Sequence, residues 1–404
     1  MGCVGSFGVG LEAFRATLSG STQATRSVEP PSDLPRRFDR PLPAHLVGDL
    51  SITEWLSPIE ARRMSRPSRF ATVAALEALA DAGTPPEPTV DPDLGTVVAT
   101  TFGPVETTQK LLDQYLEHGP EFMSPAIFSE CVANAPAAHV SLSGRAGGAN
   151  LTVVQREAGP LTAVATAAGL LADGRAERCL AGAAEEMSPL LLGLLDGFGA
   201  VSPDRARPFD RNRDGYVPAE GASILCLETE SRARRRGVTG RCRVVGAGAA
   251  FDPTSSSATV GREATRVGEA VRERMGARRI DPTSIDLVVS GASGSRAIDA
   301  WEALCLRALW SEGELPPVVA PKGATGEYGG FPLVAAVLLA QGDTIHPTLG
   351  FEKSDPDLGI TPVTRTPGTS TDDAGPQGRR VLVTGTSAGG QFAWLVLEGP
   401  HVQR

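Results

Sequence analysis

Residues 150–164, NLTVVQREAGPLTAV, have the pattern with which many enzymes present a nucleophile. An apolar run, a sharp turn and a stretch of small residues predict a strand, a tight elbow and a helix. The elbow, residues 155–159, contains no Ser, Cys or Thr to act as the nucleophile. It carries Glu157, and because the positive end of a helix dipole favours an anion by about 0.3–1 kcal/mol, we expect a charged carboxylate there.

Strands and helices alternate on both sides of this elbow, which predicts helices packed on a largely parallel sheet. The basic segment 232–236 is the best candidate junction between two α/β halves, 1–236 and 237–404. Residues 353–378, rich in Pro and Asp, predict an irregular excursion. The expected strands are 94–101, 149–154, 178–183, 224–228, 243–248, 286–290, 317–320, 380–384 and 393–398. The expected helices are 11–18, 62–83, 106–116, 160–172, 262–275, 299–309 and 331–341.

The bulk composition of the 404 residues excludes several classes of protein. A net charge of -9 argues against nucleic acid or an anionic membrane as the main partner. The sequence has no apolar run of the roughly 18 residues that a membrane span needs. The six cysteines are scattered without a CxxC pair or a His/Cys cluster, which favours free thiols in the cytoplasm and predicts neither a metal nor another cofactor.

Four motifs, taken together, resemble the β-ketoacyl synthases of the thiolase fold. That resemblance implies a thiolase-like α/β fold of two pseudo-repeated halves in a layered αβαβα arrangement. The family's first strand precedes a glycine turn, whereas this chain begins MGCVGSFGVG, so either the strand is abbreviated or the start codon is misassigned. The motifs are GANLTVVQREAG (148–159), GRAERCLAGAAEEM (174–187), RPFDRNRDGYVPAEGASILCLE (207–228) and VTGTSAGGQFAWLVLE (383–398).

The resemblance also assigns the places of the family's catalytic Cys, two His and nearby Lys. The Cys place falls on Glu157, the first His place on Gly291 and the second on Glu327, while the lysine is retained as Lys322. In the family, the thiolate accepts the acyl chain and the imidazoles hold the malonyl thioester. A Glu adduct would be a hydrolysable anhydride, and a glycine offers no donor to a developing enolate. None of the five histidines lies in these loops, and His346 is interpreted as structural.

A ketosynthase fold with all three catalytic side chains replaced resembles the chain-length factor, the β subunit of a type II polyketide ketosynthase. In that subfamily the Cys is commonly Gln; Glu157 departs from this pattern, although Gln155 lies two residues upstream. The resemblance implies a non-catalytic chain that pairs with a cysteine-bearing α subunit and lines the far end of its acyl tunnel. An acyl carrier protein would be met mainly through the α subunit. Product class, aromatic polyketide or reduced polyene, would depend on the partner enzymes.

The resemblance further suggests which surfaces of the chain serve these roles. The strand before the elbow would contact the partner subunit, and one helix would approach the tunnel end. The interface candidates are Asn150, Leu151, Thr152, Val153 and Val154, and the tunnel candidates are Thr107, Leu111 and Gln114. Five charged residues are interpreted as one structural ion-pair network: Arg207, Asp210, Arg213, Asp214 and Glu220.

Two other functions compete with this interpretation. Glu157 and Glu327 could converge in one pocket as the acid and base of a hydrolase or decarboxylase, which requires a strongly raised pKa for one of them. Alternatively, the chain could be a homodimeric pseudo-enzyme that scaffolds a carrier protein.

Overall fold

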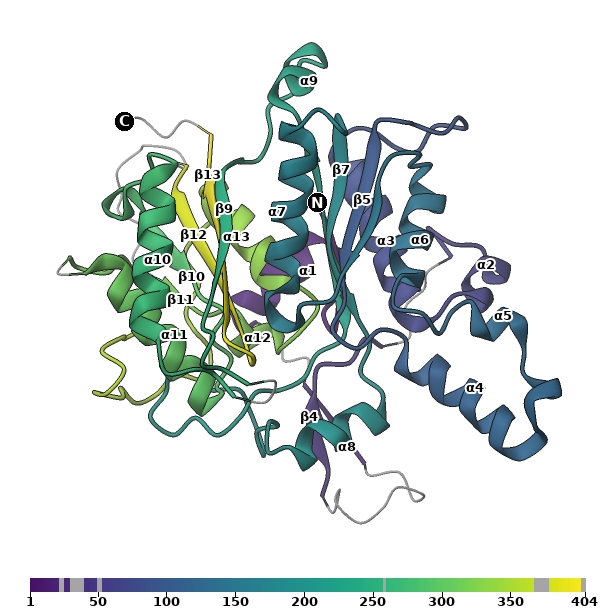
Figure 1. Ribbon diagram of the computed structural model, residues 1–404, viewed down its shortest axis with the longest axis horizontal. Helices are drawn as coiled ribbons and strands as arrows, with labels where there is room; N and C mark the ends of the chain where they lie inside the picture. The colour runs from purple at the N-terminus through teal and green to yellow at the C-terminus, as the bar shows by residue number, and fades with distance from the viewer. Residues whose placement is uncertain are drawn as a thin grey trace.

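The computed structural model describes residues 1–21, 25–29, 40–48, 53–256, 259–311, 313–366 and 378–400. Two sheets lie face to face, with helices between them and on both outer sides (Figure 1). Three hydrophobic cores separate these five layers, one between the sheets and one under each outer helical layer. The thiolase-like αβαβα layering that the motifs implied is confirmed.

The first sheet has six strands in the order β2-β1-β8-β7-β5-β6. Their bounds are β1 (Gly2–Gly5), β2 (Gly8–Val9), β5 (Leu94–Ala99), β6 (Asn150–Val153), β7 (Arg178–Glu185) and β8 (Gly221–Glu228). Strand β5 is parallel to both β6 and β7, whereas β8 runs antiparallel to β7 and β1. A short strand therefore does precede the glycine turn: all four residues of β1 are buried.

The second sheet repeats this pattern in the order β11-β10-β12-β13-β9. Its strands are β9 (Arg243–Phe251), β10 (Leu287–Val289), β11 (Val318–Val319), β12 (Arg380–Ser387) and β13 (Gln391–Glu398). Strand β10 is parallel to β11 and β12, while β13 is antiparallel to β12 and β9. The halves are thus a true pseudo-repeat. The prediction of largely parallel sheets was wrong, because the last strand of each half, β8 or β13, runs antiparallel to both of its neighbours.

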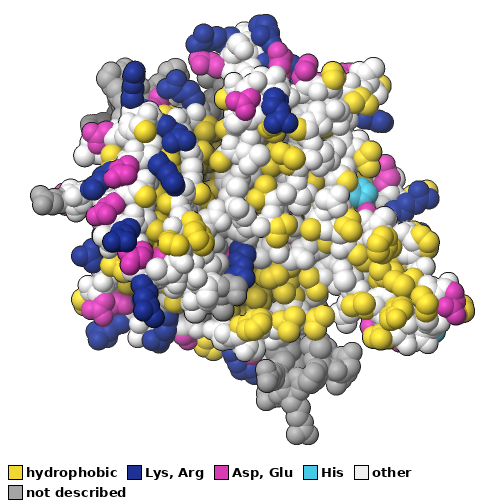
Figure 2. All heavy atoms as spheres, viewed as in Figure 1, with side chains coloured by type: hydrophobic (Ala, Val, Ile, Leu, Met, Phe, Trp, Pro, Cys, Tyr) yellow, Lys and Arg dark blue, Asp and Glu magenta, His cyan; other side chains and the backbone are white. Residues whose placement is uncertain are grey.

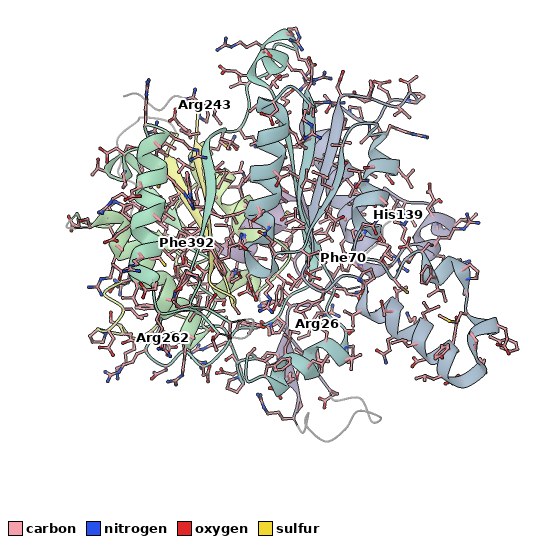
Figure 3. All side chains as sticks on the ribbon, viewed as in Figure 1. Arg26, Phe70, His139, Arg243, Arg262 and Phe392 are labelled. Atoms are coloured by element: carbon pink, nitrogen blue, oxygen red, sulfur yellow. The ribbon has the colours of Figure 1, made fainter. Side chains whose placement is uncertain are left out.

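Helices α7 (Gly159–Ala172) and α13 (Phe331–Gln341) fill the space between the sheets, together with α1 (Leu11–Leu18). Ten of the eleven residues of α13 are buried, which suits a helix that is apolar on every side. Helices α3 (Arg66–Asp81) and α6 (Ala135–Gly144) cover the outer face of the first sheet, and α10 (Ala264–Ala277) and α11 (Arg296–Trp310) cover that of the second. Phe70 and Phe392 mark these two outer cores (Figure 3).

The predicted helix over residues 62–83 is two helices, α2 (Pro58–Arg63) and α3. Ser57 and Glu60 form a capping box at the start of α2, and Met64 and Ser65 are extended. Pro67 cannot donate the hydrogen bond that a continuous helix needs there, and its ring would clash with the carbonyl of Arg63. The same apolar periodicity continues through both helices, so the sequence pattern gives no sign of the break between them.

An arm of helices projects from the first half beside the sheets (Figure 1). It consists of α4 (Val105–His118), η1 (Pro120–Phe122) and α5 (Pro125–Phe128). Helix α8 (Pro189–Gly197) lies near the pair β3 (Arg26–Val28) and β4 (Leu42–Ala44). Within residues 353–366 no helix or strand forms, and 367–377 lie outside the described residues. Across the described ranges, no helix is long and apolar enough to cross a membrane.

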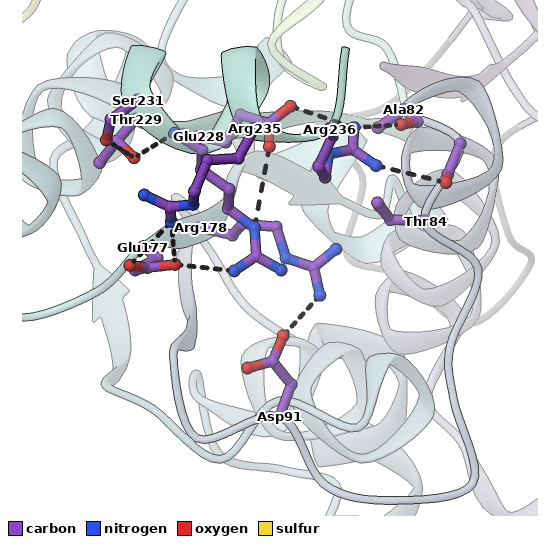
Figure 4. A network of polar contacts seen from close by, with 12 residues as sticks. Ala82, Thr84, Asp91, Glu177, Arg178, Glu228, Thr229, Ser231, Arg235 and Arg236 are labelled. Atoms are coloured by element: carbon purple, nitrogen blue, oxygen red, sulfur yellow. Dashed lines mark hydrogen bonds and ion pairs between the residues drawn. The ribbon is translucent and has the colours of Figure 1, made fainter. Parts of the chain in front are cut away.

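The chain passes from the first sheet to the second through α9 (Glu230–Arg235), in the basic segment that predicted a junction. Its arginines are held by ion pairs and carbonyl groups, as Figure 4 shows. Arg235 lies 3.1 Å from Glu177, and Arg236 donates to Ala82 O at 2.8 Å. The exact boundary between residues 236 and 237 stays a prediction.

Candidate functional site

The elbow between β6 and α7 has the geometry that the sequence predicted, with one turn of 3₁₀ helix, η2 (Arg156–Ala158), between strand and helix. The backbone of Arg156 has a φ of 49°, an uncommon value for a residue other than glycine. A side chain added at Gly159 would place its Cβ 3.2 Å from that of Ala99 on β5, so the helix starts in close contact with the sheet. The elbow therefore directs Glu157 to the carboxyl ends of the strands.

Glu157, Lys322 and Glu327 line a single pocket between the two halves, together with residues of β5, β7 and β12. The pocket has a volume of about 30 Å³, which is room for about two water molecules. Small-molecule sites generally measure about 300–1,000 Å³, so this pocket is far too small for an acyl chain.

Lys322 and Glu327 form an ion pair inside this pocket. Their side chains expose only 6% and 2% of their surfaces. Lys322 begins the short helix α12 (Lys322–Thr325), and Glu327 follows the left-handed Gly326, so the chain turns back and brings both charges together. A buried ion pair is costly to break from one side, and the retained lysine is therefore engaged within the chain itself.

Glu157 has no such partner. Its Oε2 atom is buried and lacks a hydrogen-bond partner among the described residues. Burial, followed by the nearby charge of Glu327, raises the pKa of Glu157 to about 7. Burial therefore opposes the charge that the turn predicted, because the loss of hydration outweighs the attraction of Lys322 and Arg156. Near neutral pH a large fraction of this carboxyl group is protonated.

The first histidine place, Gly291, lies outside the residues that line the pocket. A Cβ there would stand 2.9 Å from Thr384 O and 3.1 Å from the Cα of Gly385. The Gly291 amide donates to Glu302 Oε1 at 3.0 Å, and the same oxygen accepts from Thr384 Oγ1 at 2.6 Å. The backbone and this hydrogen-bonded loop occupy the space that a larger side chain would need.

Tyr328, which the sequence analysis did not single out, lines the pocket and packs against two further aromatic side chains. The hydroxyl groups of Tyr216 and Tyr328 are 3.0 Å apart, and the ring of Phe102 packs edge-on against Tyr328 with centroids 5.2 Å apart. Tyr328 has a φ of 81° within the glycine-rich run 326–330. A tyrosine inside such a run was the one available signal.

The five interface candidates lie on β6, the edge strand of the first sheet, or directly after it. Leu151 and Val154 expose 39% and 58% of their surfaces, whereas Val153 packs against the central core. Thr152 Oγ1 is buried and has no hydrogen-bond partner in the part of the chain that the structure describes, and Asn150 donates a hydrogen bond to Ser141. In this chain the outer edge of β6 pairs with no other described strand.

The three tunnel candidates share one face of α4 and do not line the pocket. Leu111 is buried, Thr107 is half-buried, and Gln114 accepts a hydrogen bond from the amide of Ser124 at 3.2 Å. The adjoining face of α4 carries apolar residues that are exposed. The role of Thr107, Leu111 and Gln114 as tunnel residues stays a prediction.

Exposed apolar side chains lie on this face of α4, on the rest of the arm and on α6, β6 and α8. Figure 2 shows hydrophobic side chains gathered over the arm and over the lower middle of the molecule. Leu116 and Phe198 expose 77% and 83% of their surfaces. We call this surface the apolar face; its members are Leu112, Tyr115, Leu116, Phe122, Phe128, Val132, Leu142, Leu151, Val154, Leu194 and Phe198. Surfaces of this kind mark sites of protein association.

The charged motif over residues 207–220 is structural but does not form one network. Arg207 and Asp214 pair with each other, but the other members bind parts of the chain outside the motif and so fasten separate loops. The contacts are Arg207 with Asp204 and Asp214, Asp210 with the amides of Glu352 and Lys353, Arg213 with Asp355, and Glu220 with Arg66. His346 is buried, its Nδ1 lies 3.1 Å from Pro347 O, and burial lowers its pKa.

Comparisons with known proteins agree with the geometry. The profile described as "Beta-ketoacyl synthase, N-terminal domain" matches residues 1–233, and "Beta-ketoacyl synthase, C-terminal domain" matches residues 241–352. A putative polyketide beta-ketoacyl synthase 1 of Streptomyces cyaneus is 30% identical, with 99% of this chain and 97% of that protein covered. The tetracenomycin polyketide synthase ketoacyl synthase beta subunit of Streptomyces glaucescens is 32% identical over 91% of this chain and 90% of its own. The solved structure of the ishigamide ketosynthase/chain length factor superposes with a TM-score of 0.86 at 25% identity, covering 98% and 97% of the two chains.

Proposed function

The chain belongs to the β-ketoacyl synthase family, and on that premise we propose that it is the chain-length factor of a type II polyketide ketosynthase. It pairs with a cysteine-bearing α subunit in the cytoplasm, and the α subunit performs the condensation. This chain completes the dimer and shapes the far end of the acyl tunnel. The carrier protein delivers its chain mainly through the α subunit.

The small pocket is the observation that carries this proposal. It preserves the elbow, the lysine and the strand ends of a ketosynthase site, yet a carboxyl group, a glycine and an ion-paired glutamate stand at the three catalytic places. With a volume of about 30 Å³ it cannot hold an acyl chain. A site that retains its backbone geometry but has no nucleophile suits a subunit that completes the dimer and does not catalyse the reaction.

The apolar face supports a partner subunit. Exposed leucine, phenylalanine and valine side chains lie on the arm and on the edge strand β6, and obligate interfaces are richer in apolar side chains than ordinary surfaces. This strand is also where the resemblance leads us to expect the partner. Size-exclusion chromatography of this chain co-expressed with a type II ketosynthase α subunit tests the pairing: a stable 1:1 complex is expected, and a homodimer that ignores the α subunit would refute it.

One observation favours a second function, in which Glu157 is a general acid or base in hydrolysis or decarboxylation. Its pKa of about 7 is the value that such catalysis requires at neutral pH. Glu327, however, is paired with Lys322 and cannot serve as its free partner. Product formation by the pair with Glu157→Gln decides between them, since unchanged turnover excludes catalysis by Glu157.

A further inference from the structure

The segment between β5 and α4 is held by two consecutive carboxylates, Glu185 and Glu186, at the end of β7. Glu185 is buried and accepts hydrogen bonds from the amides of Thr101 and Phe102 at 2.6 and 3.1 Å. It also accepts from Thr100 Oγ1 at 3.0 Å. The parallel pairing of β5 with β7 brings Ala99 beside Ala183, which sets Glu185 next to this segment.

Glu186 binds the next part of the same segment, the first turn of α4. Its side chain is fully buried, and its Oε1 accepts from the Glu106 amide at 2.5 Å. No side chain caps this helix locally, since the residue at the N-cap is Pro104. An orphan amide of the first turn is thus satisfied by a residue 80 positions away in the sequence.

Helix α4 has few other attachments to the body of the molecule. Leu111 is its one buried residue, and its most extensive contacts are with η1 and α5, which follow it in the arm. The direction in which α4 leaves the sheet is therefore set largely at its first turn, where Glu186 is bound.

We propose that Glu186 is a positioning residue for product length, acting by fixing the direction of α4. This inference rests on the proposed function, because Thr107 and Leu111 matter for length only if α4 approaches the acyl tunnel of a partner. Glu185 makes the base rigid by holding the preceding segment, so a change at Glu186 alters where the helix lies rather than whether it forms.

The experiment compares Glu186→Ala with Glu186→Gln in two measurements. Glutamine keeps an acceptor oxygen for the Glu106 amide, whereas alanine removes it. In the isolated chain, we expect amide exchange in the first two turns of α4 to be about ten-fold faster with alanine and near wild type with glutamine, as loss of one hydrogen bond to a carboxyl group predicts. In the complex with an α subunit, alanine should broaden or shift the distribution of product lengths, and glutamine should restore it.

Glu117→Ala is the matched control, because Glu117 is an exposed acid at the far end of the same helix. Faster exchange with unchanged product lengths would overturn the proposal, as would unchanged exchange. Should the alanine variant not fold, Glu186→Asp, which withdraws the acceptor by one methylene group, is judged by the same two results. Failure of the wild-type chain to bind an α subunit would refute the proposed function, and this inference with it. Normal binding with product lengths that do not change in the Glu186 variants would refute this inference alone.

Discussion

Lys322 and Glu327 are paired with each other inside the pocket, and their side chains expose only 6% and 2% of their surfaces. One is the lysine that the ketosynthase family retains, and the other stands where the resemblance places its second histidine. Each buried charge is neutralised by the other. Glu327, which stands at the histidine place, therefore also binds the ammonium group of Lys322. Both charged side chains are thus engaged with each other inside the pocket.

Breaking this pair from one side should be strongly destabilising. Glu327→Ala leaves the ammonium group of Lys322 buried and unpaired, and we expect a loss of roughly 3–5 kcal/mol in the free energy of unfolding. The double variant Lys322→Met/Glu327→Leu, which removes both charges at similar volume, should lie much closer to wild type. Urea denaturation measures both.

Glu352→Ala is the control, since it breaks an exposed pair with Arg205 whose side chains expose 62% and 49% of their surfaces. Exposed pairs contribute about 1 kcal/mol or less. A cost for Glu327→Ala no larger than that of the control would show that the buried pair is not needed.

The pH dependence of stability should report Glu157. Because burial and Glu327 raise its pKa in the folded state to about 7, the folded chain holds this proton more tightly than the unfolded chain does. Stability should therefore be unaffected by Glu157 below the unfolded value near 4.5, fall as pH rises from there to about 7, and stay lowered above it.

Glu157→Gln removes this effect. Its thermal midpoint should match wild type near pH 4.5 and exceed it at pH 8, where the difference corresponds to roughly 1–3 kcal/mol. A gap between the two proteins that does not change with pH would contradict the raised pKa. Glu177→Gln, at a surface carboxylate whose pKa is lowered by Arg232, should not show a stabilisation that grows with pH.

Tunnel length should respond to bulk on the inner face of α4. Thr107→Phe and Leu111→Trp add volume where the resemblance places the end of the acyl tunnel, so the pair containing either variant should release shorter products. Mass spectrometry of the products measures this. Asp113→Trp adds similar bulk on the opposite, exposed face of α4 and should leave lengths unchanged; equal effects from all three would remove Thr107 and Leu111 as tunnel residues.

The apolar face should carry the partner interface. Leu116→Asp and Val154→Asp each place a charge on it, and we expect either change to weaken binding of an α subunit at least ten-fold in calorimetric titration. Val238→Asp should bind normally, because Val238 is exposed and follows α9, a helix that Figure 1 shows at the opposite end of the molecule from α8. Full affinity in the first two variants would place the interface elsewhere.

The fold could be predicted from the sequence because the residues of one helix or strand share one pattern of apolar and small side chains. The apolar run of β6, the small residues of α7 and the all-apolar α13 each specify one element and its depth. It missed the break at Ser65 because both helices share one apolar periodicity, and it missed the antiparallel strands because a local pattern does not encode the direction of a neighbour.

The positions of the site residues could be predicted from the sequence, but their protonation and hydrogen bonding could not. Motif spacing located Glu157, Lys322 and Glu327, which the structure brings together, and Gly291, which it leaves outside the pocket. The charge of Glu157 depends on burial and on Glu327, 170 residues away, and neither is visible in the turn itself. The hydrogen bond from the Glu106 amide to Glu186 likewise depends on the register of β5 against β7.

The most direct test is reconstitution with a cysteine-bearing type II ketosynthase α subunit encoded in the same genome. We expect a 1:1 heterodimer that elongates carrier-bound malonyl units, with turnover unchanged by Glu157→Gln in this chain and abolished by Cys→Ala in the partner. A homodimer with no affinity for the α subunit, or loss of turnover with Glu157→Gln, would contradict it.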